Sequence, residues 1–167
     1  QWEYACRAGT TTAYSWGNAI ASSNANYNWD GAHNTGNDFK QTRDVGQYAA
    51  NPWGFFDMHG NVWEWTADWY QAAYPSGAVT DPTGPASGSY RVERGGSWGT
   101  DGTYLRSAWR VDGTPSDRSF NIGFRVGFKA IQPDMANPEL ELFGGAAVTR
   151  EAGQAWAEPD LAAHDAR

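Results

Sequence analysis

The stretch from Asp57 to Tyr70 constrains the fold more than any other part of the chain. It reads DMHGNVWEWTADWY, with tryptophans at positions 63, 65 and 69 and carboxylates at positions 57, 64 and 68. Indole rings bury a large apolar area, so this stretch must contribute to a core. A carboxylate in such surroundings is costly unless a cation or several hydrogen-bond donors satisfy it. We therefore expect a buried aromatic centre with an acidic oxygen site beside it.

Composition indicates a loop-rich fold. The 167 residues include 20 Gly, 10 Trp, 8 Tyr and 7 Phe, while Leu and Lys, which long helices use, are scarce. The length suits one ordinary domain and a little more. Aromatic side chains supply the apolar area that aliphatic ones do not, which favours short strands between long loops.

Charge and cysteine content exclude several kinds of partner. The formal net charge is -7, and residues 131–167 hold seven acidic and two basic side chains. Phosphate binding needs a positive surface, so we expect no nucleic-acid partner. No run is long and apolar enough for membrane insertion. The single cysteine, Cys6, rules out an internal disulfide and a multi-thiolate metal site.

The order of expected elements follows from breakers and periodicity. Residues 1–8 favour a helix that stops at Gly9. Strands are expected at 62–65, 90–98, 104–111 and 122–131. The Gly95-Gly96 pair is expected to break the second of these strands. The intervening segments 10–37, 70–89 and 113–121 are expected to be loops.

Composition changes after Gln132, which suggests a boundary. We predict a main domain over residues 1–131, a linker over 132–138, and the start of a truncated immunoglobulin-like β module over 139–167. The last segment resembles the opening of bacterial immunoglobulin-like repeats. That resemblance implies an extracellular or cell-surface setting.

Five motifs in order resemble the formylglycine-generating enzyme, or sulfatase-modifying factor, family. They are QWEYACRAG at 1–9, GNVWEW at 60–65, RGGSW at 94–98, RSAWR at 106–110 and NIGFR at 121–125. The resemblance implies a C-type-lectin-like α+β fold that is loop-rich, with short antiparallel strands and few helices. It also implies that the family domain begins before Gln1.

Active members of that family oxidise a sulfatase cysteine to formylglycine with two active-site cysteines, a copper ion and oxygen. The cysteines are expected just after the RGGSW motif, where this chain has Thr100 and, near the second position, Leu105. Neither side chain is a copper ligand or a sulfur nucleophile. We therefore expect no copper and no oxidase activity from these residues.

The resemblance also implies structural calcium, which prefers six to eight oxygen ligands. One site would use Asp57, Gly60, Val62 and Glu64. A second site would use Asn26, Tyr27, Asp38 and Phe39. The alternatives are that Glu64 pairs with Arg94 or Arg125, that Asp57 caps a turn, and that Asn26 bonds its own backbone.

The hypothesis that we favour is a non-catalytic, calcium-stabilised binding or scaffold domain for a protein, peptide or glycan. Its ligand surface would lie within residues 99–120 and include Thr100, Asp101, Tyr104, Trp109, Asp112 and Arg118. The alternative is an oxidoreductase of the formylglycine-generating type, or another protein- or small-molecule-modifying enzyme, whose active residues lie outside this sequence.

The remaining candidates have structural interpretations. Core positions are predicted for Trp63, Trp65, Trp69 and Trp98, whereas Trp109 and Tyr104 could stack on a sugar. Four arginines, at 94, 106, 110 and 125, are expected to pair internally rather than form an anion site. Cys6 is predicted to be a small buried side chain, and His59 to have no base or nucleophile partner.

Overall fold

The computed structural model describes residues 1–28, 36–37, 39–74, 76–80, 82–128, 139–142 and 148–149. Its first element is the helix α1 (Trp2–Arg7), which buries Trp2 and Cys6. The helix ends where Ala8 adopts a left-handed conformation with φ 46°, and Gly9 follows with φ 88°. A left-handed residue after the last turn is a common helix stop. The predicted helix is confirmed, and it ends one residue earlier than predicted.

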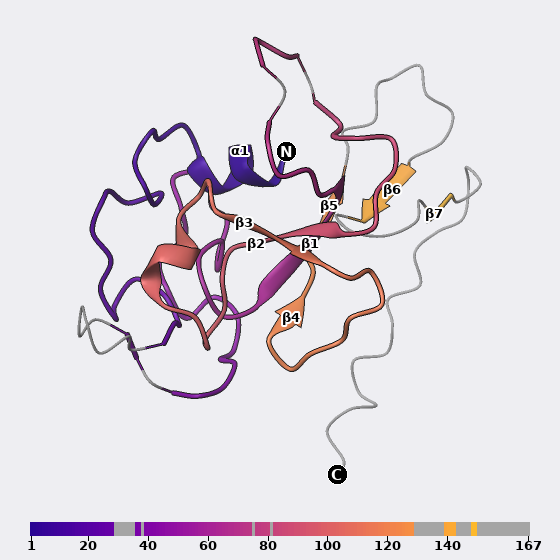
Figure 1. The fold of residues 1–167 in the computed structure, drawn as a ribbon. Coiled ribbons are helices and arrows are strands. Elements are labelled where there is room, and N and C mark those ends of the chain that lie inside the picture. The colour runs from indigo at the N-terminus through magenta and orange to yellow at the C-terminus, as the bar shows by residue number, and fades with distance from the viewer. Residues whose placement is uncertain are drawn as a thin grey trace.

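A four-stranded sheet forms the centre of the molecule (Figure 1). Its strands are β1 (Trp63–Trp69), β2 (Arg91–Arg94), β3 (Arg110–Gly113) and β4 (Ile122–Gly123), in the order β3-β2-β1-β4. The β1–β2 and β2–β3 pairs are antiparallel, whereas β4 runs parallel to β1. The short strands and long connections confirm the loop-rich α+β class.

A second sheet pairs β5 (Val126–Phe128) with β6 (Glu139–Leu142), and β6 with β7 (Val148–Thr149). Val126 lies opposite Leu142 in the antiparallel β5–β6 pair. The predicted linker 132–138 and most of 139–167 fall outside the described residues. The proposed domain division and the immunoglobulin-like module therefore stay predictions.

Two expected strands differ in the structure. Residues 102–105 form a 3-10 helix, η1 (Gly102–Leu105), where a strand was predicted from 104. The Asp101 side chain accepts a hydrogen bond from the Thr103 amide at 2.8 Å and caps this turn. The predicted strand 122–131 is interrupted between β4 and β5, where Arg125 turns inward to an ion pair with Glu64.

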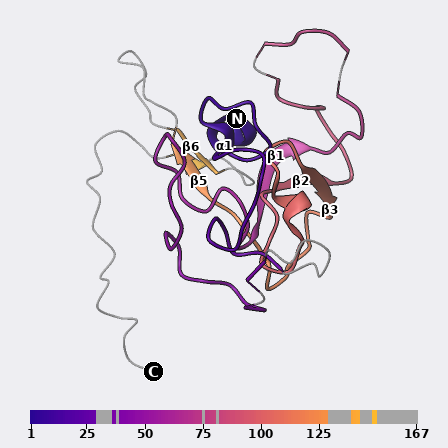
Figure 2. The same ribbon diagram turned by 90° about the vertical axis from the view of Figure 1, so that its left-hand side faces the viewer.

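Within the part of the chain that the structure describes, the core has two small hydrophobic clusters. One contains Tyr14, Ala25, Tyr27 and Leu105, and the other Trp2, Cys6 and Met58. Figure 2 shows α1 and the neighbouring loops on one side of the central sheet. The long loops have few backbone hydrogen-bond ladders of their own. Side chains in these two clusters therefore hold the loops together.

The tryptophans that were predicted to be core are less buried than expected. Trp63 is 7% exposed, but Trp65, Trp69 and Trp98 are only half-buried. The Arg91 guanidinium lies 3.5 Å from the centre of a Trp69 ring and covers it. A cation over an indole face stabilises the ring without removing it from the surface.

Among the described helices, none is long and apolar enough to cross a bilayer.

Candidate functional site

The loop after Ser97-Trp98 is the place where the resemblance locates catalytic sulfur, and it is a closed structural turn. Thr100 Oγ1 accepts a hydrogen bond from the Ser97 amide at 2.9 Å and donates one to the Ser97 carbonyl at 3.0 Å. Leu105 is fully buried in the core. Thr100 therefore closes a turn and Leu105 packs in the core, so neither presents a reactive group.

Cys6, the only cysteine in the sequence, lies in a different place. It is fully buried in α1, and its Sγ is 3.7 Å from the Met58 carbonyl and 3.5 Å from His59 Nε2. Burial raises the pKa of this thiol to about 12. The thiolate is the nucleophile and the metal ligand, so Cys6 is inert at neutral pH. Its prediction as a small buried side chain is confirmed.

His59 joins three segments that are far apart in the sequence. Its Nδ1 lies 2.7 Å from the Leu105 carbonyl, and a carbonyl only accepts, so Nδ1 carries the proton. Nε2 then accepts from the Ser15 amide at 3.2 Å, with Ser15 Oγ also at 3.2 Å. Burial lowers the pKa of His59 to about 4, so the ring is neutral at pH 7.

The prediction that His59 has no nucleophile partner is wrong, because both Ser15 and Cys6 lie beside it. The sequence carried no signal for this contact, since the partners are 44 and 53 residues away. The arrangement does not amount to a catalytic pair. Cys6 carries a protonated thiol here, and His59 is an interior ring that contacts the Cys6 thiol, the Ser15 amide and hydroxyl, and the Leu105 carbonyl.

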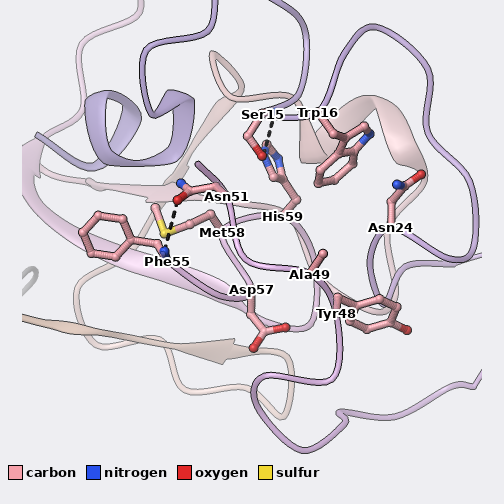
Figure 3. Close-up of a pocket in the computed structure, with 10 residues that line it drawn as sticks. All are labelled: Ser15, Trp16, Asn24, Tyr48, Ala49, Asn51, Phe55, Asp57, Met58 and His59. Carbon is pink, nitrogen blue, oxygen red and sulfur yellow. Dashed lines mark hydrogen bonds between the residues drawn. The ribbon is translucent and has the colours of Figure 1, made fainter. Parts of the chain in front are cut away.

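A small pocket lies beside His59 (Figure 3). Its volume is about 10 Å³, about one water molecule. Asn51 closes one side, because its Oδ1 accepts from the Phe55 amide at 3.0 Å while its Nδ2 donates to the Ala5 carbonyl at 2.7 Å. The pocket is lined by Ser15, Trp16, Asn24, Tyr48, Ala49, Asn51, Phe55, Asp57, Met58 and His59.

An aromatic array forms part of the predicted ligand surface. The Tyr104 ring packs edge-on against Trp109 at 4.9 Å between ring centres, and against Trp63 at 6.3 Å. The Arg106 guanidinium lies 5.0 Å from the centre of Trp109. Tyr104 and Trp109 are both half-buried. The structure thus brings these two predicted residues together on one rigid base.

The other residues of the predicted surface are arranged differently. Asp101 caps η1 next to Tyr104, while Thr100 turns inward. Asp112 on β3 and Arg118 in the following loop are exposed. The structure thus brings Asp101, Tyr104 and Trp109 close to one another, while the predicted ligand surface as a whole stays a prediction.

The first predicted calcium site contains an ion pair. Glu64 is 5% exposed, and its carboxylate receives Arg125 Nη2 at 2.5 Å and Nε at 2.6 Å. The Asp57 carboxylate accepts from the Gly46 amide at 2.7 Å and so stabilises a turn. Gly60 is held by a hydrogen bond from its amide to the Gly95 carbonyl at 2.8 Å, and Val62 is half-buried before β1.

The second predicted calcium site has one unsatisfied ligand atom. Asn26 is 1% exposed, and its Nδ2 donates to the Gln41 carbonyl at 3.0 Å, while its buried Oδ1 has no hydrogen-bond partner. The Tyr27 carbonyl accepts from the Asn37 amide at 3.0 Å. Phe39 is 43% exposed, and Asp38 falls outside the described residues. A buried amide oxygen without a partner is rare, and a cation would satisfy it.

Two of the four arginines pair with carboxylates, as expected. Arg94 contacts Glu3 Oε2 at 3.1 Å and the Ser107 and Trp109 carbonyls at 3.3 and 3.2 Å, and Arg125 pairs with Glu64. Arg106 and Arg110 instead donate to the backbone carbonyls of Thr103 and Ala72 in exposed hydrogen bonds. Their geometry favours loop fixation over an anion site.

The family assignment rests on most of the chain. Residues 1–130 match the model of the sulfatase-modifying factor enzyme 1-like domain. The chain belongs to this family. Formylglycine-generating enzyme of Mus musculus is 37% identical over 135 residues, which are 75% of this chain and 36% of that protein. That of Streptomyces coelicolor is 38% identical over 137 residues, 75% of this chain and 43% of that protein.

Members of the sulfatase-modifying factor family with other names are also similar. Inactive C-alpha-formylglycine-generating enzyme 2 of Mus musculus is 33% identical over 144 residues, 80% of this chain and 42% of that protein. The chain thus spans less than half the length of these three relatives.

Solved structures confirm the C-type-lectin-like fold of the family. Treponema denticola variable protein 1 superposes with a TM-score of 0.65 and 35% identity, covering 74% of this chain and 43% of that one. PvdO from Pseudomonas aeruginosa gives a TM-score of 0.60 and 29% identity, covering 74% of this chain and 48% of that one.

Proposed function

We propose that this sulfatase-modifying factor domain is a non-catalytic binding or scaffold domain. One observation carries the proposal: the only sulfur nucleophile in the sequence, Cys6, is fully buried beside His59, while positions 100 and 105, where the resemblance locates the catalytic cysteines, hold threonine and leucine. Thr100 and Leu105 have structural contacts instead. A copper–thiolate oxidase needs accessible thiolates, and this sequence offers none.

The ligand surface would be centred on Tyr104 and Trp109. Half-buried aromatic rings on a fixed base supply contact area at low entropic cost, which suits the edge of a peptide or the face of a sugar. Asp101 adds hydrogen-bond acceptors at one side. The relative named as an inactive formylglycine-generating enzyme supports the idea that this family keeps its fold without its chemistry.

Two measurements test this function. Incubation of the full-length protein with copper, oxygen and a cysteine-containing sulfatase peptide should leave the cysteine unchanged by mass spectrometry. On glycan and peptide arrays, Trp109→Ala should abolish any binding that the wild type shows. Trp53→Ala is the matched control, because Trp53 is 46% exposed and packs on Tyr4, away from this surface. Conversion of the cysteine, or equal binding by both variants, contradicts the proposal.

We further propose that structural calcium binds at Asn26. The unpartnered Oδ1 of Asn26 supports this site. The resemblance adds Asp38 and the Phe39 carbonyl. A calcium ion there would supply the positive charge that ties residues 26–28 to residues 37–41. An extracellular or cell-surface setting, with millimolar calcium, would keep even a weak site filled.

Calcium titration with thermal melting tests this site. Binding to the folded state alone must raise Tm, so calcium should stabilise the wild type over the EDTA-treated protein. Asn26→Ala should abolish the rise. Asn24→Ala is the control, because Asn24 Oδ1 already accepts from the Ala21 amide at 2.8 Å. A rise that survives Asn26→Ala contradicts this location.

An enzymatic function is the second candidate, because active formylglycine-generating enzymes are among the relatives and extend well beyond the matched part. Residues outside this sequence would then provide the sulfur ligands. Copper titration of the full-length protein distinguishes the two candidates. Tight binding of one equivalent favours the enzyme, whereas a response to calcium alone favours the binding domain.

A further inference from the structure

The buried carboxylate of Glu64 is fully satisfied by groups of the protein itself. Oε1 receives Arg125 Nη2 at 2.5 Å, and Oε2 receives both Arg125 Nε and Trp2 Nε1 at 2.6 Å. Glu64 is 5% exposed. Two parallel N–H···O bonds from one guanidinium are the strongest geometry for an arginine–carboxylate pair. The indole N–H adds a third donor, so the negative charge is compensated in place.

The same guanidinium also binds backbone oxygens of the neighbouring turn. Arg125 Nη2 lies 3.1 Å from the Phe56 carbonyl and 3.2 Å from the Asp57 carbonyl. One cation thus contacts a carboxylate and two carbonyls, which is the type of oxygen set that calcium uses. Here the cation is the planar guanidinium of Arg125, whose N–H groups donate to these oxygens in a fixed geometry.

The residues present do not fit a calcium ion at this position. Both oxygens of Glu64 are already bound to Arg125, and the Asp57 carboxylate is used by the Gly46 amide instead. A divalent ion on Glu64 would have to displace the guanidinium. The divalent ion and the Arg125 guanidinium would then lie side by side in a buried place, and the repulsion between these two positive charges is strongly unfavourable.

We infer that Arg125 is the resident cation of this site, in the place where the resemblance assigns calcium to Asp57, Gly60, Val62 and Glu64. The ion pair joins β1 to the break between β4 and β5, and Trp2 brings in α1. The centre of the domain is therefore closed without metal. Any stabilisation by calcium acts elsewhere, and this inference is independent of the proposed ligand surface and of the site at Asn26.

The test compares calcium responses of variants at this site by thermal melting and isothermal titration calorimetry. Glu64→Gln should lower Tm equally in calcium and in EDTA, and should leave the number of bound calcium ions unchanged. Arg125→Met should lower Tm in EDTA and open the site, so that calcium restores several degrees of Tm. The double variant Glu64→Gln/Arg125→Met should lose that restoration.

Calcium binding by Glu64→Gln can also contradict the inference. The inference is overturned if Glu64→Gln removes one bound calcium ion, or the calcium-dependent rise in Tm, from an otherwise folded protein. If Arg125→Met does not fold, the titration of wild type against Glu64→Gln decides alone, since both keep Arg125. A wild type that binds no calcium at all would refute the site at Asn26 and agree with the inference for Arg125.

Discussion

Cys6 Sγ lies 3.5 Å from Nε2 of His59, in the interior of the domain and not at its surface. A cysteine beside a histidine is often a reactive pair when the histidine is charged, because His⁺ favours the thiolate. Here burial has the opposite effect on both groups. It raises the pKa of Cys6 to about 12 and lowers that of His59 to about 4. Both are neutral at pH 7, so the contact serves packing and hydrogen bonding.

The first prediction concerns thiol reactivity. Ellman's reagent should not label Cys6 in native buffer at pH 7 to 8, because the thiol is fully buried and protonated. In guanidinium chloride the same protein should react at once with one equivalent, which serves as the control. Rapid labelling of the native protein would show that Cys6 is accessible and reactive, contrary to the structure.

The second prediction concerns stability in mild acid. His59 has a folded-state pKa of about 4, below the 6.5 of an unfolded histidine, so between these values the unfolded chain binds the proton and the folded one does not. The free energy of unfolding should therefore fall as pH drops from about 6.5 to 4. The slope from this group is at most about 1.4 kcal/mol per pH unit.

Urea unfolding at a series of pH values measures this effect. His59→Gln should be less stable at pH 7, because its neighbours lose a ring acceptor, but its stability should depend less on pH across the same window. An identical slope in His59→Gln and the wild type would assign the acid sensitivity to other groups.

The third prediction concerns Glu93 on β2, which is 6% exposed. Burial, with the nearby carboxylates of Asp117 and Asp112, raises its pKa to about 7. The unfolded chain loses this proton near pH 4.5 and the folded chain near pH 7, so stability from this group falls as pH rises between the two values. Glu93→Gln should raise Tm at pH 7.5 and have little effect at pH 4.5, by calorimetry. A variant that melts lower at pH 7.5 would indicate that the charged form has a stabilising role.

The fourth prediction compares two glycines with the same φ angle. Gly54 and Gly60 both have φ +84°, so alanine strains the backbone at both positions. A Cβ at 54 would meet nothing within 4 Å, whereas one at 60 would collide with the Asn26 carbonyl and lie 3.0 Å from Leu105.

Gly54→Ala should therefore cost about 1 kcal/mol of unfolding free energy, measured by urea unfolding. Gly60→Ala should cost more than about 3 kcal/mol, because backbone atoms must also move. Similar losses in the two variants would mean that the contact between residue 60 and Asn26 is not tight.

Local features of the sequence predicted several elements well. The break of β2 before Gly95 was found where expected. The helix predicted over residues 1–8 ends one residue earlier, at Arg7, because Ala8 already adopts the left-handed conformation before Gly9. The strand predicted from Tyr104 was wrong, because Asp101 caps a 3-10 turn and Leu105 is needed in the core. Alternation alone could not distinguish a strand from a short turn that buries every third residue.

The tryptophans show the limit of residue type as a predictor of burial. Trp63 is in the interior, while Trp69 is covered by Arg91 from the neighbouring strand. Both are large and apolar, so composition predicts the same position for both. Their burial differs because the residues of β1 become more exposed from Trp63 towards Trp69. Residue type does not encode this position in the sheet.

By itself, the sequence determined the family, the α+β class, the absence of sulfur at positions 100 and 105, and the need for a cation or several hydrogen-bond donors beside Glu64. These follow from residue identity and short-range order. Only the tertiary structure decided that the cation is Arg125, 61 residues away, and that Cys6 meets His59, 53 residues away. Partners at such distances are chosen by how loops and strands pack, because a buried charge takes whichever counter-charge the fold brings within hydrogen-bond reach.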